Sequence, residues 1–294
     1  MEAAKPAPKH ANVQAFFHPP SSTVSYVVYD APGGTAAIID SALDFDAASG
    51  RLGTASADAL AGFVAEQGLG VAWILETHIH ADHLSAATHL QHRLGGRIGV
   101  GAQVTAVQAH FGKVFHDPLG VRRDRQAFDR LFQDGDRFSV GALAGEVLHT
   151  PGHTPDSVAY RIGDALFVGD TLFMPDGGTA RCDFPGGDAR QMYRSLRRLL
   201  ALPPETRVFV CHDYAPGGRT HAWESTVAEQ RRANIHVRDG VDAESYINLR
   251  TARDRTLPMP ALIIPAVQVN VAAGRLPDPE GNGTVYLKMP VNVL

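Results

Sequence analysis

The 294-residue sequence is poor in cysteine and contains no long hydrophobic run. Its two cysteines, Cys182 and Cys211, do not form a CxxC pair, which argues against a disulfide framework and against a thiolate zinc site. No apolar stretch approaches the roughly 18 residues that a membrane helix needs. The first residues also lack the apolar core of a secretory signal, so we expect a cytoplasmic protein with no membrane partner.

An excess of basic residues is also absent. The formal net charge is -4, and the basic residues are scattered, whereas a phosphate backbone is bound by a concentrated basic surface. We therefore expect small-molecule partners and no nucleic acid. With 44% hydrophobic and 20% charged residues, the chain has the composition of an ordinary globular protein. Composition leaves the oligomeric state open, with a homodimer as one candidate.

Hydrophobic periodicity predicts a mixture of hairpins and strand-helix units. The expected strands lie at 23–29, 36–40, 71–77, 97–100, 145–149, 157–162, 165–169 and 206–211, and the expected helices at 56–68, 84–94, 103–111, 188–201 and 222–233. This mixture indicates an α/β (α+β) fold with helices outside its sheets. We expect a catalytic domain over 1–245 and a packed C-terminal extension over 246–294, which is rich in Pro and Gly.

Histidine is the unusual residue of this composition, with fourteen copies. The segment His78-Ile79-His80-Ala81-Asp82-His83 places three imidazoles and a carboxylate directly after an expected buried strand. Side chains two positions apart on an extended segment share a face, so His78 and His80 can approach one ion. A solvated polar loop is the alternative, but the HxHxDH spacing favours a metal site.

Three later residues extend this pattern: His153 in TPGHTPDS, Asp170 in LFVGDTLF and His212 in VFVCHDY. Each ends or follows an apolar run. Taken singly, the histidines could be core or surface residues, and Asp170 could cap a strand. Turn-forming residues before His153 and Asp170 favour loop tips, where sites on α/β scaffolds tend to lie.

Together, HxHxDH, the PGHT segment, GDTLF and the late His resemble the metallo-β-lactamase superfamily over roughly residues 20 to 235. The resemblance implies a four-layer αββα sandwich with a metal site at one edge of the two sheets. The family's ligand positions fall on His78, His80, Asp82, His83, His153, Asp170 and His212. Because one fold supports many reactions, the superfamily alone does not identify the activity.

The segment Arg181-Cys182-Asp183-Phe184 and the later His212-Asp213-Tyr214 resemble the persulfide dioxygenase branch. That resemblance implies a non-haem Fe(II) sulfur dioxygenase with one iron per chain on His78, His153 and Asp170, the facial triad of such oxygenases. His80, Asp82, His83 and His212 would surround this site or fill a vacant second one. The implied reaction oxidises glutathione persulfide with O2 and water to sulfite and glutathione, in sulfide detoxification.

Some assignments rest on single residues. Tyr214, Asp82 and His83 are the expected catalytic residues, and Arg181, Arg219 and Tyr214 the expected substrate-binding residues; the arginines would meet the glutathione carboxylates. Tyr214 could equally be a packing residue, and packing is the favoured role of Cys182, where the family more often has Thr. The alternative function is a thioester hydrolase of the glyoxalase II kind with two metals. It is disfavoured because a GRFFEG-like segment and an obvious helical, basic C-terminal domain are missing.

Overall fold

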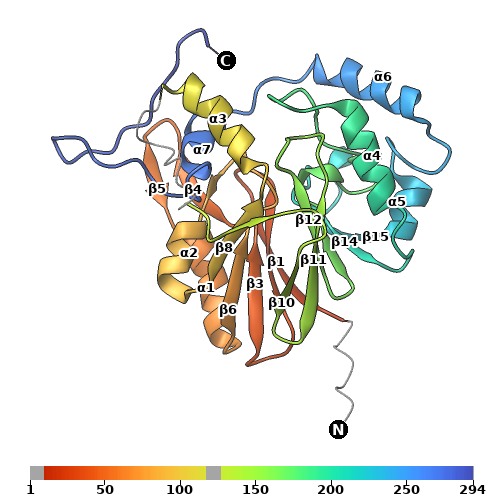
Figure 1. Ribbon diagram of the computed structural model, residues 1–294, viewed down its shortest axis with the longest axis horizontal. Helices are drawn as coiled ribbons and strands as arrows, with labels where there is room; N and C mark the ends of the chain where they lie inside the picture. Colours follow the sequence, from red (N-terminus) through yellow and green to blue (C-terminus); the bar gives the residue numbers. More distant parts are fainter. Residues whose placement is uncertain (1–9, 117–126, 294) are drawn as a thin grey trace.

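Two six-stranded sheets face each other in the computed structural model, which describes residues 10–116 and 127–293 (Figure 1). The first sheet has the order β1 (Asn12–His18), β2 (Thr23–Tyr29), β3 (Thr35–Ile39), β6 (Gly70–Leu75), β8 (Arg97–Gly101), β9 (Arg130–Phe132). The second has the order β10 (Arg137–Val140), β11 (Leu143–His149), β12 (Val158–Ile162), β13 (Ala165–Phe167), β14 (Arg207–Phe209), β15 (Glu224–Thr226). A small third sheet joins β5 (Arg51–Gly53), β4 (Ala42–Asp46) and β7 (Leu84–Ser85).

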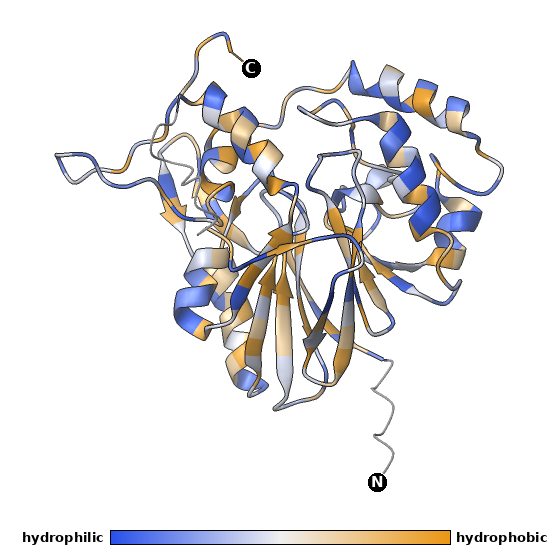
Figure 2. Cartoon of the chain, viewed as in Figure 1, coloured by the Kyte–Doolittle hydropathy of each residue, from blue (hydrophilic) through white to orange (hydrophobic). Residues whose placement is uncertain are grey.

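Helices cover the outer faces of both large sheets. The first sheet packs against α1 (Ala55–Glu66), α2 (Ala87–Leu94), α3 (Val104–Val114) and α7 (Ile263–Asn270). The second packs against α4 (Ala189–Leu199) and α5 (Val227–Ala233), and α6 (Ala243–Asp254) packs against α4. Figure 2 shows hydrophobic residues running along the strands and hydrophilic residues on the outer turns of the helices. The expected four-layer αββα sandwich is confirmed.

The strand directions explain where the functional loops lie. In the first sheet β3, β6, β8 and β9 run parallel, and in the second β13 and β14 run parallel. Parallel strands present their carboxyl ends at the same edge. Residues that follow β6, β13 and β14 therefore gather at one edge, and they include the HxHxDH segment, Asp170 and His212.

Two expected helices start too early. Residues 84–85 form β7, which pairs with β4, and residues 224–226 form β15, which pairs with β14; α2 and α5 begin only after these short strands. Local helical periodicity cannot anticipate such pairing, because the partner strand lies far away in the sequence. Helix α6 also runs across residue 245, so the expected division between domain and extension falls inside a helix.

The C-terminal extension is more helical than its Pro and Gly content indicates. In α7 the residues Ile263, Ala266, Val267 and Asn270 are buried at helical spacing, and Pro265 lies in the first turn, where a backbone N–H has no helical partner. Across residues 10–116 and 127–293, none of the helices has the length and apolar character needed to cross a bilayer.

The core between the sheets should respond strongly to truncation at Phe167. This side chain is 1% exposed, and its ring centroid lies 5.1 Å from that of Phe209 and 5.3 Å from that of Tyr26. We expect Phe167→Ala to lower the free energy of unfolding by about 3–5 kcal/mol, measured by denaturant titration. Leu52→Ala, at a position 38% exposed, is the matched control and should change it little. Equal effects of the two variants would contradict this packing.

Candidate metal centre

His78, His153 and Asp170 meet at the edge of the two sheets. One ligand atom from each lies within 4.8 Å of the others, and all three residues are buried. His153 Nε2 is 3.6 Å from Asp170 Oδ2, and the rings of His78 and His153 are nearly perpendicular at a centroid distance of 5.0 Å. Three separate loops, after β6, between β11 and β12, and after β13, supply these side chains. The arrangement can hold a single ion.

The second polar atom of each ligand is engaged elsewhere. His153 Nδ1 donates to the carbonyl oxygen of Arg181 at 2.8 Å, and His78 Nδ1 lies 3.0 Å from Thr77 Oγ1. Asp170 Oδ1 accepts from His212 Nδ1 at 2.7 Å. These bonds leave the Nε2 atoms of the two histidines and Oδ2 of Asp170 available to a metal. Such outer partners fix the tautomer and orientation of metal ligands.

The protonation states also suit a cation. Burial, together with the neighbouring His80, holds the pKa of His78 well below its usual value, so its imidazole is neutral. Although burial alone would raise the pKa of Asp170, its bond to His212 lowers it, and the carboxyl is ionised. Neutral imidazoles and a carboxylate are the forms that bind metal ions. These residues therefore fit the metal that the sequence resemblance implies.

Asp40 anchors this arrangement, and the sequence analysis missed it. Its carboxylate accepts from the backbone N–H of Thr77 at 2.7 Å and from Thr77 Oγ1 at 2.9 Å. The Thr77 hydroxyl proton is thereby committed, so the oxygen accepts from His78. Asp40 has a positive φ of 51°, which is uncommon outside glycine and marks a conformation held by its surroundings. Its place at the end of the apolar run AAIID was the available signal.

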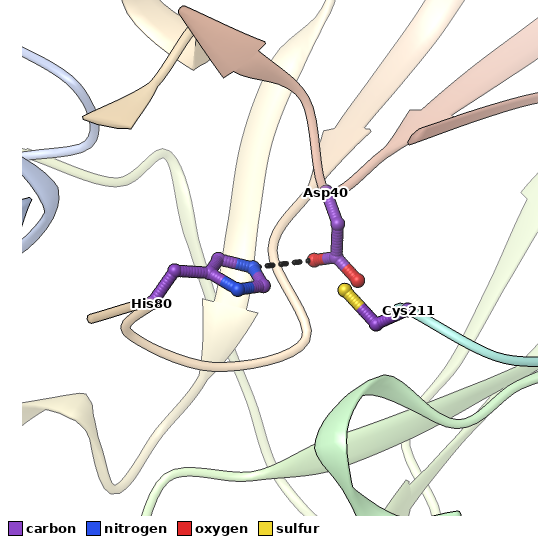
Figure 3. Close-up of side chains that lie close together, drawn as sticks. All are labelled: Asp40, His80 and Cys211. Carbon is purple, nitrogen blue, oxygen red and sulfur yellow. Dashed lines mark hydrogen bonds and ion pairs between the residues drawn. The ribbon is translucent and has the colours of Figure 1, made fainter. Parts of the chain in front are cut away.

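The bonded nitrogen of His80, Nε2, does not point toward the three ligands. Its Nε2 donates to Asp40 Oδ1 at 3.0 Å and lies 3.4 Å from Glu76 Oε2, and Figure 3 shows it pointing toward Asp40 with Cys211 beside them. Burial opposes a charge here, but Asp40 and Glu76 raise the pKa of His80 well above its usual value. Burial also raises the pKa of the Cys211 thiol, which disfavours the thiolate that a metal would need.

His212 bridges two carboxylates. Its Nδ1 is 2.7 Å from Asp170, and its Nε2 is 2.7 Å from Asp82 Oδ2, which also accepts from Thr23 Oγ1 at 3.1 Å. Burial lowers the pKa of His212, but the two carboxylates outweigh it and raise the pKa well above the usual value. A protonated His212 therefore donates to Asp170 on one side and to Asp82 on the other.

His83, the last residue of the HxHxDH segment, is buried and neutral. Its Nδ1 is 3.3 Å from the carbonyl oxygen of Leu84, and burial lowers its pKa to about 4. In the part of the chain that the structure describes, His83 Nε2 and His80 Nδ1 have no hydrogen-bond partner. The two rings lie 4.4 Å apart. His83 is thus close to the centre but is joined to none of the three ligands.

The expected substrate-binding arginines already have internal partners. Arg181 makes a two-point contact with Asp183 at 2.6 and 2.9 Å, and its guanidinium lies over Phe184. Arg219 makes two-point contacts with both Asp176 and Asp213 at 2.6–2.8 Å. A substrate carboxylate would have to compete with these groups, which the sequence analysis did not foresee. Their role in substrate binding stays a prediction.

Tyr214 and Cys182 lie in opposite environments. Tyr214 is 61% exposed, and its ring stacks parallel to that of His212 at a centroid distance of 6.0 Å, at the outer side of the site. Cys182 is buried, and burial together with Asp254 raises the pKa of its thiol to about 12. The thiol therefore stays protonated at neutral pH, which supports a packing role.

Two glycines permit the close packing of the ligand loops. A Cβ on Gly152, before His153, would lie 2.4 Å from Cα of Met192 in α4. A Cβ on Gly169, which has a φ of 51°, would lie 2.5 Å from Thr77 Oγ1. Only glycine allows such close approaches. The turn-forming residues noted in the sequence thus bring the loops from the two sheets together.

Asp156 and Asn270 also support the site and were missed. Asp156, fully buried in the segment PGHTPDS, accepts from the backbone N–H of Ile79 at 2.9 Å. Asn270, at the end of α7, donates to the carbonyl oxygens of His80 and His83. A buried Asp beside a predicted ligand was a usable signal, whereas nothing local to Asn270 points to this loop.

A family model described as the metallo-beta-lactamase superfamily matches residues 18–212. The chain is 53% identical to a probable metallo-hydrolase of Burkholderia pseudomallei, covering 96% of this chain and 99% of that protein. It is 44% identical to glyoxylase B2 of Dictyostelium discoideum, with 97% and 98% covered. A beta-lactamase hydrolase-like protein of Agrobacterium fabrum is 52% identical over 96% of this chain, but only 65% of that protein is spanned.

More distant similarities point to one branch. The chain is 29% identical to human mitochondrial persulfide dioxygenase ETHE1, with 89% of this chain and 88% of that protein covered. The crystal structure of ETHE1 from Myxococcus xanthus superposes with a TM-score of 0.71 at 32% identity. That comparison covers 90% of this chain and all of the other.

The three-ligand assignment can be tested by metal analysis. We expect His78→Ala, His153→Ala and Asp170→Ala each to remove the bound metal, because two donors hold an ion far more weakly than three. Metal content per chain would be measured after purification without added metal. His92→Ala, at an exposed position on α2, is the control and should keep the metal. Full metal content in any of the three variants would contradict the assignment.

Stability should fall in mild acid because of His236, which lies behind the Arg181 segment. Its Nδ1 accepts from the Thr179 backbone N–H at 3.0 Å, and burial followed by Arg250 lowers its pKa from 6.5 to about 4. The unfolded chain binds this proton first, so stability is complete above pH 6.5 and is lost toward about pH 4. The loss is roughly 3 kcal/mol at most.

Unfolding free energies of the wild type and His236→Asn, measured from neutral pH to about pH 4, check this expectation. Because the variant cannot titrate at this position, the stability gap between the two proteins should narrow as the pH falls. A gap that is constant with pH would show that His236 does not titrate as described.

Proposed function

The chain belongs to the metallo-β-lactamase superfamily, and on that basis we propose that it is a persulfide dioxygenase with one iron held by His78, His153 and Asp170. The observation that carries the proposal is the division of the seven ligand positions. Three converge as two imidazoles and a carboxylate, while His80 is bonded to Asp40 and His212 to Asp82. His80, Asp82 and His83 also place ligand atoms within 4.8 Å of one another, but the internal bonds of His80 and Asp82 support one ion over two.

The donor set suits non-haem iron. Two histidines and one carboxylate are the facial ligands of Fe(II) oxygenases. Bound there, Fe(II) would supply the redox chemistry that O2 activation needs and would keep coordination positions free for reactants. The similarity to human persulfide dioxygenase ETHE1 and to the Myxococcus ETHE1 structure supports this branch.

The proposed reaction consumes one persulfide, one O2 and one water, and yields one free thiol and one sulfurous acid, which ionises to sulfite. The terminal sulfur is oxidised, O2 is reduced, and the S–S bond is broken. The proposed carrier is glutathione. No further oxidant is required, since O2 accepts all the electrons that the sulfur loses.

The chain's own residues position and shield this chemistry. His212 holds a proton between Asp170 and Asp82 and so fixes the orientation of the Asp170 carboxylate. Phe184, whose ring centroid is 5.0 Å from that of His153, and Phe173, which lies 5.9 Å from Tyr214, provide apolar edges that restrict water. The exposed Tyr214 hydroxyl is the group proposed to contact the substrate.

Substrate binding by Arg181 and Arg219 requires each arginine to exchange an internal carboxylate. Arg181 would leave Asp183, which is itself partly exposed, and Arg219 would leave Asp176 while keeping the buried Asp213. In this arrangement the acidic partners fix the positions of the two guanidinium groups in the absence of substrate. Asp82 and His83 are proposed as supporting groups beside the metal.

A thioester hydrolase of the glyoxalase II kind is the second candidate. It is favoured by the names of two more similar relatives, a probable metallo-hydrolase and glyoxylase B2. Such an enzyme would use two metals bridged by Asp170. In the present arrangement a second ion would first have to replace the His212–Asp82 bond.

Oxygen consumption separates the two candidates. We expect O2 uptake in proportion to added glutathione persulfide, release of sulfite, close to one iron per chain, and negligible cleavage of S-lactoylglutathione. An oxygen electrode, sulfite assay and metal analysis measure these, with His153→Ala as the inactive reference. Rapid anaerobic hydrolysis of the thioester by protein holding two zinc ions, without O2 uptake on persulfide, would instead assign the hydrolase.

A further inference from the structure

The side chain of Asn270 enters the HxHxDH segment from the C-terminal extension. Asn270 is the last residue of α7 and is 2% exposed. Its amide nitrogen donates to the carbonyl oxygens of His80 and His83, both at 2.8 Å, and its oxygen accepts from the backbone N–H of Ser85 at 2.7 Å. All the groups facing the carboxamide fit this orientation.

These bonds satisfy backbone groups that have no strand partner. Between β6 and β7 the chain turns through the ligand segment, and Asp156 holds the Ile79 N–H from the side of the second sheet. Asn270 holds the other end of the segment from the helical side. Buried carbonyl and N–H groups without partners are unfavourable, so the loop would move if Asn270 were lost.

The end of α7 is itself fastened to the same region. The backbone N–H and the hydroxyl of Thr88 both bond to the carbonyl oxygen of Ala273, at 3.1 and 2.7 Å. A Cβ on Gly274, which has a φ of 82°, would lie 2.4 Å from the carbonyl oxygen of Ser85. The carboxamide is therefore delivered by a helix end in direct contact with the residues that follow the ligand segment.

We infer that Asn270 is a positioning residue of the metal centre. By fixing the peptide groups of His80 and His83, it sets the direction of His78 at the start of the segment and of Asp82 within it. Asp82 in turn bonds to His212, which orients Asp170. The inference rests on the assigned metal centre but holds for any metal and reaction there, including either candidate function.

The test compares Asn270→Ala and Asn270→Asp with Gln268→Ala. Gln268 lies two residues earlier on α7, and within the described residues its side chain bonds only to backbone groups of Ile264 and Lys288, so it controls for damage to the helix. Asn270→Asp keeps the shape and the acceptor for Ser85 but places a carboxylate against two carbonyl oxygens. If Asn270 only fills space, Asn270→Asp should be better tolerated than Asn270→Ala. If Asn270 positions the loop through its amide N–H donors, Asn270→Asp should be the worse variant.

Two readouts are needed. Hydrogen exchange of peptides spanning 78–85 in the metal-free protein reports the loop itself, and Co(II) affinity by chelator competition reports the centre. We expect both Asn270 variants to exchange faster there and to bind Co(II) about 10–100-fold more weakly, with Gln268→Ala unchanged. If Asn270→Ala does not fold, Asn270→Ser, which retains one donor, serves the same comparison. The inference would be overturned by a folded Asn270 variant whose hydrogen exchange matches that of the wild type and whose Co(II) affinity lies within twofold of the wild-type value.

Discussion

Carboxylates can be buried together only if their charges are compensated, and the organisation of the metal centre follows from this constraint. Asp40, Glu76, Asp82 and Asp170 are balanced by His80 and His212, which stand between them. Backbone N–H groups and hydroxyls satisfy much of the remaining acceptor capacity. The three convergent ligands keep one free atom each because their other polar atoms are engaged in this network.

The two-sheet sandwich makes such a network possible. Neither sheet alone contains the centre: Asp40 and His78 follow strands of the first sheet, whereas His153, Asp170 and His212 follow strands of the second. The loops of the two sheets approach closely here, since a Cβ on Gly169 would lie only 2.5 Å from Thr77 Oγ1. The apolar layer between the sheets therefore sets the distance between ligands that arise far apart in the sequence.

The sequence was sufficient for the family's fold and for the residues that could reach the metal, because HxHxDH is a compact local pattern on a strand end. The sequence was insufficient to identify the hydrogen-bond and salt-bridge partners of these residues. The salt bridge of Arg181 with Asp183 spans two residues and could have been anticipated, but that of Arg219 with Asp176 depends on a loop 43 residues away. Asp40 and Asn270 act through tertiary contacts that no periodicity encodes. Helix α7 was missed because its β-branched residues and proline favour other structures, and burial of one face outweighs that preference.

The extension has a further consequence for biosynthesis. Asn270 is separated by 187 residues from His83, whose carbonyl it binds, and Asp254 of α6 accepts from the backbone of Cys182, next to the Arg181 carbonyl that orients His153. A ribosome releases these supports long after it has released all three ligands. With the proposed role of Asn270, the ligand segment is fully braced only after α7 has been synthesised.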